Sequence, residues 1–522
     1  MTSAGPTNCT GVTSQSAGYI QRCAGRGWLD ARQKAYPVSG KYDEFRARPA
    51  DHAKALRMIP KVLAPTKDPV FGRSRRDLSK DFGSKECVEV RTRKAIPQMA
   101  TRQTRRSQLL RALGPGLITG AADDDPSGIA TYSQAGAQFG FSITWTLLFT
   151  YPLMCVIQEI SARIGRTTGK GIAANIRNYY SSSVLHVIVF LLVIANTINI
   201  GADLSAMADA LRLLVGGSTV AYVMMFGSIC AFVQVFVPYS RYVSYLKWLT
   251  FALFTYFGTA IAVEIPWGEA ARGFFIPTIS RDSDFWTLVV AIFGTTISPY
   301  LFFWQASQEV EEIKNVEPRK PLVMAPTQAA SALERIKVDT YIGMAFSNLV
   351  ALAIMFTTAA TLHAAGTTDV QTSSQAAEAL RPIAGPFAFA IFTIGVIGTG
   401  LLAVPVLAGS AAYAIGEAFK WPTGLDRKPQ AAKAFYATII IATLSGLGIT
   451  LSPLDPIKAL FWSAVINGVV SLPVMAMMML ISVNKKIMGK FTVRGALRTL
   501  GWIATIVMAV ATAAMIGTSF GK

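Results

Sequence analysis

Three consecutive aspartates, Asp123, Asp124 and Asp125, stand inside an apolar stretch of this sequence and have the clearest capacity for chemistry. They lie roughly 11–13 residues into the stretch, which at 1.5 Å per residue puts them near the centre of a bilayer. One unpaired carboxylate at that depth costs at least about 2.5–3.5 kcal/mol. No Lys or Arg lies deep in any apolar stretch to pair with them, so the cluster predicts a cation site.

A second apolar stretch carries the same kind of interruption, because Pro299 follows Pro126 by 173 residues and each proline has polar neighbours. Proline removes a backbone donor and clashes with the preceding turn, so both helices should unwind there. Around Pro299 every polar side chain is a neutral oxygen ligand, and there is no Met, Cys or His: Thr295, Thr296, Ser298, Tyr300 and Gln305. Hard oxygen ligands suit Mg²⁺, Ca²⁺ or Mn²⁺ better than softer metals.

Other polar residues in the apolar stretches favour structural roles. Glu159 precedes Arg163 by four residues, the favourable order for a helical ion pair. Asn196 and Asn199 are expected to bond between helices. Asp203 and Asp209 are expected near an outer helix end, where solvated acids are cheap, and Gly395, Gly398 and Gly400 at positions where helices pack closely. Glu309, Glu311 and Glu312 end a helix on the cytoplasmic side, either as a mouth that attracts cations or as a solvated terminus. Asn467 is either a cavity residue or a packing residue.

These residues must be positioned by membrane-spanning helices, because the chain shows eleven apolar windows of about 18–25 residues, enough to cross roughly 30 Å of hydrocarbon. The windows are 112–136, 141–162, 183–209, 217–237, 243–263, 285–311, 338–362, 385–416, 433–451, 457–482 and 496–517. An interrupted first helix in each of two five-span halves points to a substrate site at the membrane midplane. The sequence thus predicts an all-α membrane protein with a 5+5 inverted repeat plus one span, in which spans 1 and 6 are broken.

The distribution of Lys and Arg tests this count independently. With a cytoplasmic N-terminus, 24 of them lie in inside segments after residue 100 and six lie outside, as the positive-inside rule requires. We therefore expect a multi-pass protein of the cell (inner or plasma) membrane with its C-terminus outside.

Residues 1–100 form a basic segment with 19 Lys and Arg against 9 acidic residues and no apolar run. Two interpretations remain open. The segment is a largely disordered cytoplasmic extension, or Met99 is the true start. The transporter domain is expected over 101–522.

Composition excludes several classes. A net charge of +19 suits nucleic acid only if the basic residues share a folded face, and here they separate apolar runs. The five cysteines show no CxxC spacing, and the chain lacks a nucleophile–base pair, an HExxH motif or a nucleotide-binding loop. We expect no enzyme activity, no bound cofactor, no nucleic-acid partner and no obligate protein partner, only the bilayer and a divalent cation.

The pair of interrupted spans resembles the natural resistance-associated macrophage proteins, divalent-metal/proton symporters with a LeuT-type fold. The resemblance covers about residues 112–517. The family motif Asp-Pro-Gly-Asn aligns with Asp125-Pro126-Ser127-Gly128, and Met-Pro-His aligns with Ser298-Pro299-Tyr300. The resemblance implies that Asp125 is a metal ligand. It also implies that Gly128 replaces an Asn ligand, Ser298 a Met ligand and Tyr300 a proton-linked His.

These departures resemble the NRAMP-related magnesium transporters, which are described as passing hydrated Mg²⁺ without proton coupling. No residue of 433–451 beyond Lys433 is basic, so the family's span-9 arginines have no counterpart. The resemblance leads to a specific hypothesis for the site. Asp125 is the principal ligand, Asp123 or Asp124 raises the local negative potential, and oxygens near Gly128, Thr295 and Ser298 complete a roomy site.

The sequence therefore predicts a secondary transporter that imports Mg²⁺, and also Mn²⁺, by alternating access without proton coupling. Two alternatives remain. One is a proton-coupled Mn²⁺ or Fe²⁺ symporter in which the extra aspartates replace the missing proton route. The other is an amino-acid transporter of the same fold, although three aspartates would repel a substrate carboxylate.

Overall fold

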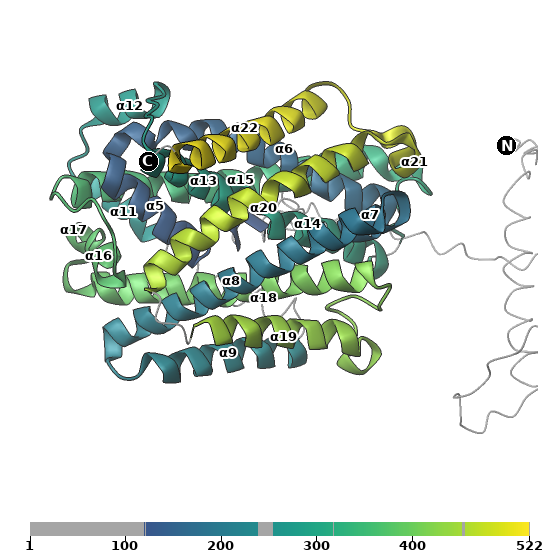
Figure 1. The fold of residues 1–522 in the computed structure, drawn as a ribbon, viewed down its shortest axis with the longest axis horizontal. Coiled ribbons are helices and arrows are strands. Elements are labelled where there is room, and N and C mark those ends of the chain that lie inside the picture. The colour runs from purple at the N-terminus through teal and green to yellow at the C-terminus, as the bar shows by residue number, and fades with distance from the viewer. Residues whose placement is uncertain (1–118, 121, 238–253, 317, 451–454, 521–522) are drawn as a thin grey trace, which may run out of the picture. The chain divides into compact units, whose positions relative to one another are not determined.

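The computed structural model describes residues 119–120, 122–237, 254–316, 318–450 and 455–520 (Figure 1). All regular elements within these ranges are helices. Eight spans in this part of the chain are long and apolar enough to cross a membrane. They are α6 (Trp145–Thr168), α8 (Ser182–Val215), α9 (Thr219–Phe236), α13 (Ser283–Thr296) with α14 (Pro299–Asn315), α15 (Ala329–Thr358), α18 (Ala388–Ala418), α20 (Pro456–Val483) and α22 (Gly495–Phe520).

The remaining helices are shorter. They are α5 (Pro126–Phe139), α7 (Ile172–Tyr179), α11 (Phe254–Ala262), α12 (Trp267–Phe275), α16 (Ser373–Glu378), α17 (Arg381–Ala384), α19 (Lys433–Ile449) and α21 (Lys485–Met488). Single turns of 3₁₀-helix lie at Gly140–Ile143, Pro326–Gln328, Gly385–Phe387, Pro429–Ala431 and Gly489–Phe491, and a π-helical turn at Ala359–His363 follows α15.

The eleven predicted windows match this architecture closely. Eight coincide with the membrane-length spans, and the ninth is α19, with 17 residues. Windows 1 and 5 lie partly outside the described residues, and α5 and α11 form their second halves. The largest boundary difference is at α15, which begins at Ala329, nine residues before the predicted start at 338. α8 continues six residues beyond 209 to Val215, where Gly216 adopts a positive φ of 72° and ends it. The predicted extension 1–100 lies outside the described residues.

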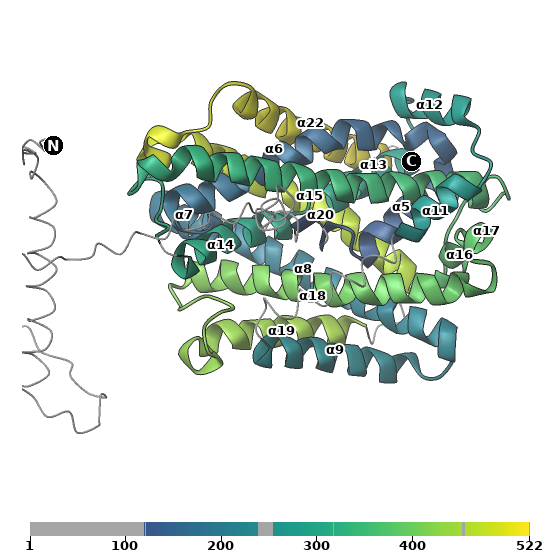
Figure 2. The same ribbon diagram turned by 180° about the vertical axis from the view of Figure 1, so that it is seen from behind.

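The contacts between helices repeat when the two halves are exchanged. α5 packs against α15, and in the same way α14 packs against α6. α8 packs against α19, α18 packs against α9, and α8 and α18 pack against each other. Figures 1 and 2 show α8, α9, α18 and α19 as neighbouring layers on one side of α5 and α14. Spans 1–5 and 6–10 therefore form two related halves. Because each half has five spans, span 1 and span 6 enter the membrane from opposite sides, and the repeat is inverted.

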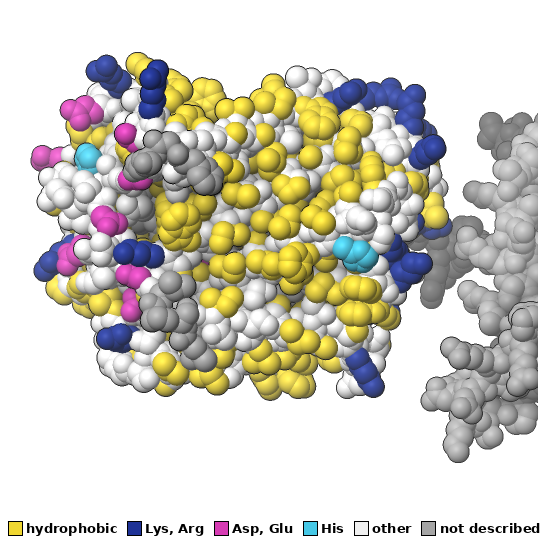
Figure 3. Space-filling view, viewed as in Figure 1, with side chains coloured by type: hydrophobic (Ala, Val, Ile, Leu, Met, Phe, Trp, Pro, Cys, Tyr) yellow, Lys and Arg dark blue, Asp and Glu magenta, His cyan; other side chains and the backbone are white. Residues whose placement is uncertain are grey.

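The surface of the helical domain is suited to a membrane. On the face drawn in Figure 3 its middle is largely apolar, and Lys and Arg gather at the end where α7 and α21 lie. Large side chains such as Phe190, Phe232 and Val510 are more than half exposed, as expected of lipid-facing positions. Among the described residues, the basic segments at α7 and α21 that were predicted to be cytoplasmic thus lie at the same end of the helical domain.

Candidate metal-binding site

The first broken helix is interrupted at Asp124 and Asp125, as predicted. Asp125 has extended backbone angles (φ −70°, ψ 172°) and is the N-cap of α5, with Pro126 in the first turn. Proline suits the first turn because its missing N–H would have no partner there. One carboxylate oxygen of Asp125, Oδ1, accepts hydrogen bonds from the Gly128 amide at 2.8 Å and from the Ser127 hydroxyl at 2.7 Å. The sequence Asp-Pro-Ser-Gly therefore fixes this carboxylate locally.

The second broken helix repeats this arrangement with a different side chain. Ser298 is the N-cap of α14 and also has extended angles (φ −79°, ψ 133°), and Pro299 follows it. Its hydroxyl faces the carbonyls of Gly294 at 2.7 Å and Thr295 at 2.8 Å, at the end of α13. The serine thus bonds to the helix before the break, whereas the aspartate bonds to the helix after it.

The two breaks lie directly against each other. The Tyr300 hydroxyl, from the first turn of α14, lies 3.0 Å from the Ala122 carbonyl and 3.4 Å from Oδ2 of Asp125. A Cβ atom built on Gly128 would lie 3.1 Å from the Thr295 hydroxyl oxygen. Of the predicted ligands, the structure therefore brings together Asp125, Gly128 and Thr295.

Asp123 and Asp124 share a different partner, Ser347 of α15. The Ser347 hydroxyl lies 2.6 Å from Oδ2 of Asp123 and 3.2 Å from Oδ1 of Asp124. One hydroxyl hydrogen cannot serve both, and the other oxygen of each carboxylate has no partner among the described residues. Both side chains are at most 1% exposed.

The three carboxylates do not surround a common point. Within the described ranges, no three Asp, Glu, His or Cys side chains lie close enough to hold a metal ion. The described part of the chain also contains no Lys or Arg in an ion pair with any of the three. A site here would therefore use one carboxylate with hydroxyl and carbonyl oxygens, and two further carboxylates nearby.

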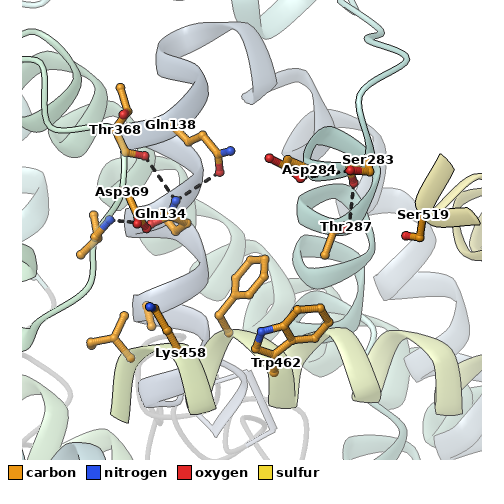
Figure 4. A pocket seen from close by; sticks show the side chains of 14 residues that line it. Gln134, Gln138, Ser283, Asp284, Thr287, Thr368, Asp369, Lys458, Trp462 and Ser519 are labelled. Carbon is orange, nitrogen blue, oxygen red and sulfur yellow. Dashed lines mark hydrogen bonds between the residues drawn. The ribbon is translucent and has the colours of Figure 1, made fainter. Parts of the chain in front are cut away.

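The enclosure of the site differs from the expected roominess. Asp125, Thr295, Thr296 and Ser298 are at most 2% exposed. A cavity of about 580 Å³ opens between α5, α13 and α20, lined by Gln134, Gln138, Asp284, Lys458 and Trp462 among others (Figure 4). A second pocket of only about 10 Å³ shares Ala130 and Ile457 with this cavity and reaches Pro126, the neighbour of Asp125. It holds at most about one water, and we call it the neck. A hydrated ion that entered by this route would require the neck to widen.

Span 3 supplies partners that the sequence interpretation did not place at the site. Asn199 is fully buried, and its amide nitrogen lies 3.0 Å from Oδ2 of Asp125. It does bond between helices, as expected, but its partner is the candidate ligand. Asp203, one turn further along α8, is also fully buried, and neither of its carboxylate oxygens has a partner in the described structure. The i, i+4 spacing of Asn199 and Asp203 in an apolar helix was the sequence feature that could have indicated a polar face directed at the site.

Glu309 and Glu311, at the end of span 6 that the sequence predicts to be cytoplasmic, form neither a solvated terminus nor an open mouth. Glu309 is fully buried and is bound through both oxygens by Arg335 at 2.7 and 3.0 Å. Glu311 accepts hydrogen bonds from the Tyr413 hydroxyl at 2.5 Å and from the Leu425 amide at 2.9 Å. For Glu309 and Glu311 both interpretations were wrong, because α15 and α18 cover them, whereas the Glu312 side chain remains 25% exposed.

Two structural predictions were correct. Glu159 forms the expected i, i+4 ion pair with Arg163 at 2.5 Å. Gly400 is a close-packing position, since a Cβ atom there would lie 2.5 Å from the sulfur of Met207. Asn467 is 1% exposed, and its amide atoms have no partner among the described residues.

Two helices broken side by side in inverted halves define the LeuT-type class of secondary-transporter folds. A manganese transporter from Eremococcus coleocola has the same fold, with a TM-score of 0.64 and 16% identity over 81% of this chain and 90% of that one. The transporter MhsT, solved in complex with L-phenylalanine, is similar with a TM-score of 0.52 and 12% identity over 78% of this chain and 97% of the other.

The chain belongs to the natural resistance-associated macrophage protein-like family, whose model matches residues 116–518. It is 26% identical to the divalent metal cation transporter MntH of Klebsiella pneumoniae over 82% of this chain and 99% of that protein. A second MntH, from Pectobacterium carotovorum, is 26% identical over 70% of this chain and 84% of its own length.

Proposed function

We propose that this protein imports a divalent metal cation into the cytoplasm by alternating access, with Mg²⁺ as its main cargo, Mn²⁺ as a second one, and no coupled proton. The family and the divalent-metal and manganese transporters named above support the cargo class. The observation that carries the proposal is the Asp125 carboxylate, 1% exposed where the two broken helices meet. A buried carboxylate at this depth is stabilised by a visiting cation.

The ligand chemistry supports Mg²⁺. Residues 122–128 and 294–300 contain no Met, Cys or His, so the breaks offer carboxylate, hydroxyl and carbonyl oxygens. Such ligands suit hard cations, and Mg²⁺ commonly keeps several waters when it binds proteins. Asp123 and Asp124, each with one oxygen that has no partner among the described residues, would add negative potential and accept hydrogen bonds from those waters.

The arrangement of closed and open regions supports alternating access. The outer cavity of about 580 Å³ stops short of the site. At the cytoplasmic end, Arg335 of α15 pairs with Glu309 and Glu312 of α14 at 2.7 and 3.2 Å. Import would require the neck beside Pro126 to widen first and the contacts between α14 and α15 to separate afterwards.

One observation favours the proton-coupled alternative. Asp203 is buried without a described hydrogen-bond partner, so it would gain from accepting a proton. The amino-acid alternative is weaker, because the Asp125 side chain itself occupies the Gly128 amide at the start of α5. Helix N-termini otherwise attract anionic groups.

Proteoliposomes containing a Mg²⁺ dye and a pH dye test the proposal. We expect Mg²⁺ and Mn²⁺ to enter without matching lumenal acidification, and Asp203→Asn to retain uptake. Acidification in proportion to metal entry that disappears in Asp203→Asn would establish the symporter instead. If the wild-type protein took up neither Mg²⁺ nor Mn²⁺, the proposal and the proton-coupled alternative for Mn²⁺ would both be refuted.

A further inference from the structure

Two buried asparagines on α8, three residues apart, both donate hydrogen bonds to other helices but have different partners. Asn196 directs its amide nitrogen to the Ser410 hydroxyl at 2.7 Å and the Leu407 carbonyl at 2.9 Å, both on α18. Asn199 directs its amide nitrogen to Oδ2 of Asp125 at 3.0 Å. Both side chains are fully buried. Only the second asparagine contacts the candidate site.

The orientation of the Asn199 amide is determined by a third helix. The Ser463 hydroxyl of α20 lies 2.6 Å from Oδ1 of Asn199 and can donate to it. With its oxygen occupied in this way, the amide presents its N–H groups to the carboxylate. The reversed orientation would place the amide oxygen against Oδ2, and two acceptors repel each other. Ser463 also has the Leu460 carbonyl within 2.7 Å, so its single hydrogen has a competing acceptor.

The Asp125 carboxylate has few positions left for an ion. A carboxylate offers about four lone-pair positions, and Ser127, Gly128, Asn199 and Tyr300 approach it at 2.7, 2.8, 3.0 and 3.4 Å. Ser127 and Gly128 belong to the same turn as Asp125. Tyr300 is the weakest donor, and it has the Ala122 carbonyl as another acceptor at 3.0 Å. An arriving cation would therefore displace Tyr300 and leave Asn199 in place.

We propose that Asn199, oriented by Ser463, is a positioning residue that fixes the Asp125 carboxylate and directs one face of Oδ2 toward the second helix break. This inference rests on the proposed function, in which Asp125 binds the transported cation. It adds that cation affinity depends on a chain of contacts from α5 through α8 to α20. The two hydrogen bonds at 3.0 and 2.6 Å constitute that chain.

Metal uptake into proteoliposomes by matched variants tests this chain. Asn199→Leu should raise the half-saturating concentrations of Mg²⁺ and Mn²⁺ by about tenfold or more, since a hydrogen bond to a charged group is lost. The maximal rate should change by less than about twofold, because the ligand itself remains. Ser463→Ala should give a smaller rise of the same kind, and Ser463→Thr, which keeps the hydroxyl, should restore the wild-type value.

Asn196→Leu and Ser410→Ala are the controls, because they remove an equivalent buried pair that does not reach Asp125. Size-exclusion profiles and thermal midpoints identify variants that fail to fold, and Ser463→Ala keeps the test decisive if Asn199→Leu is one of them. The inference is overturned if the Ser463→Ala and Ser463→Thr proteins have equal half-saturating concentrations, or if Asn196→Leu raises them as much as Asn199→Leu. Absence of uptake by the wild-type protein would instead refute the proposed function.

Discussion

The hydroxyl oxygen of Tyr300 lies 3.4 Å from Oδ2 of Asp125, so a side chain of the second broken helix contacts the carboxylate of the first. The same hydroxyl lies 3.0 Å from the carbonyl of Ala122, on the other side of the first break. Tyr300 is 1% exposed, so water does not replace these contacts. This residue therefore connects both broken helices and spans the unwound segment of one of them.

Tyr300→Phe removes that connection without changing the ring. It leaves the buried Ala122 carbonyl without the tyrosine donor, which costs about 1–3 kcal/mol. We expect a lower thermal midpoint in detergent, together with half-saturating Mg²⁺ that stays equal or falls, because a competitor for Oδ2 is gone. A rise in half-saturating Mg²⁺ of about tenfold or more would show instead that the tyrosine hydroxyl is a ligand.

Gly128 limits the space between the breaks. A methyl group there would lie 3.1 Å from the Thr295 hydroxyl and 3.4 Å from the Asp123 carbonyl. Overpacking of this kind costs about 1–3 kcal/mol, so Gly128→Ala should lower Mg²⁺ uptake by about tenfold, and Mg²⁺ should lose more than Mn²⁺ because it keeps more water. Gly448→Ala is the control, since a Cβ atom there meets nothing within 4 Å. Unchanged Mg²⁺ uptake in Gly128→Ala would contradict a site at this contact.

Asp124 tests the electrostatic part of the proposal. Its carboxylate lies near Ser347, but one of its oxygens has no partner within the described part of the chain. Asp124→Asn removes a buried charge, so the thermal midpoint should stay or rise, while half-saturating Mg²⁺ should rise by roughly threefold or more because attraction is lost. Glu334→Gln removes an exposed charge from the same protein and should leave both quantities unchanged. Equal uptake curves for Asp124→Asn and wild type would remove Asp124 from the site.

Arg335 and Glu309 form a buried ion pair, and Arg381 and Glu378 form a more exposed pair that serves as its control. The side chains of the first pair are 16% and 0% exposed, against 68% and 35% for Arg381 and Glu378. Arg335→Leu leaves Glu309 buried without its partner and should cost about 3–5 kcal/mol, whereas Arg381→Leu should cost about 0–1 kcal/mol. Thermal unfolding in detergent measures both. Similar losses in the two variants would show that the pair does not hold α14 against α15.

Much of this structure was predictable from the sequence because the membrane imposes strict rules. Apolar windows and basic loops indicate the spans, and Pro126 and Pro299 indicate both breaks. The residues that surround Asp125 were harder to predict. Asn199 and Ser463 are 264 residues apart, and no local pattern indicates that α20 passes beside α8 at that depth.

The prediction for Glu309 and Glu311, at the acidic end of span 6, was wrong for a related reason. Glu309 and Glu311 occupy a helix end, where solvation is the ordinary expectation, but neighbouring helices bury them and supply Arg335 and Tyr413. Local sequence gives the charge of a helix end, whereas tertiary packing decides whether water reaches it.

The most direct measurement compares Mg²⁺ uptake by wild type and Asp125→Asn in proteoliposomes. The substitution keeps the shape of the side chain and an oxygen that can accept from Gly128, so it removes the charge and retains the cap. We predict saturable Mg²⁺ and Mn²⁺ entry in the wild-type protein and loss of that entry in the variant, whose thermal midpoint should remain close to the wild-type value. Undiminished Mg²⁺ uptake by Asp125→Asn would contradict the account, because the charge at the meeting point of the two broken helices would then play no part in transport.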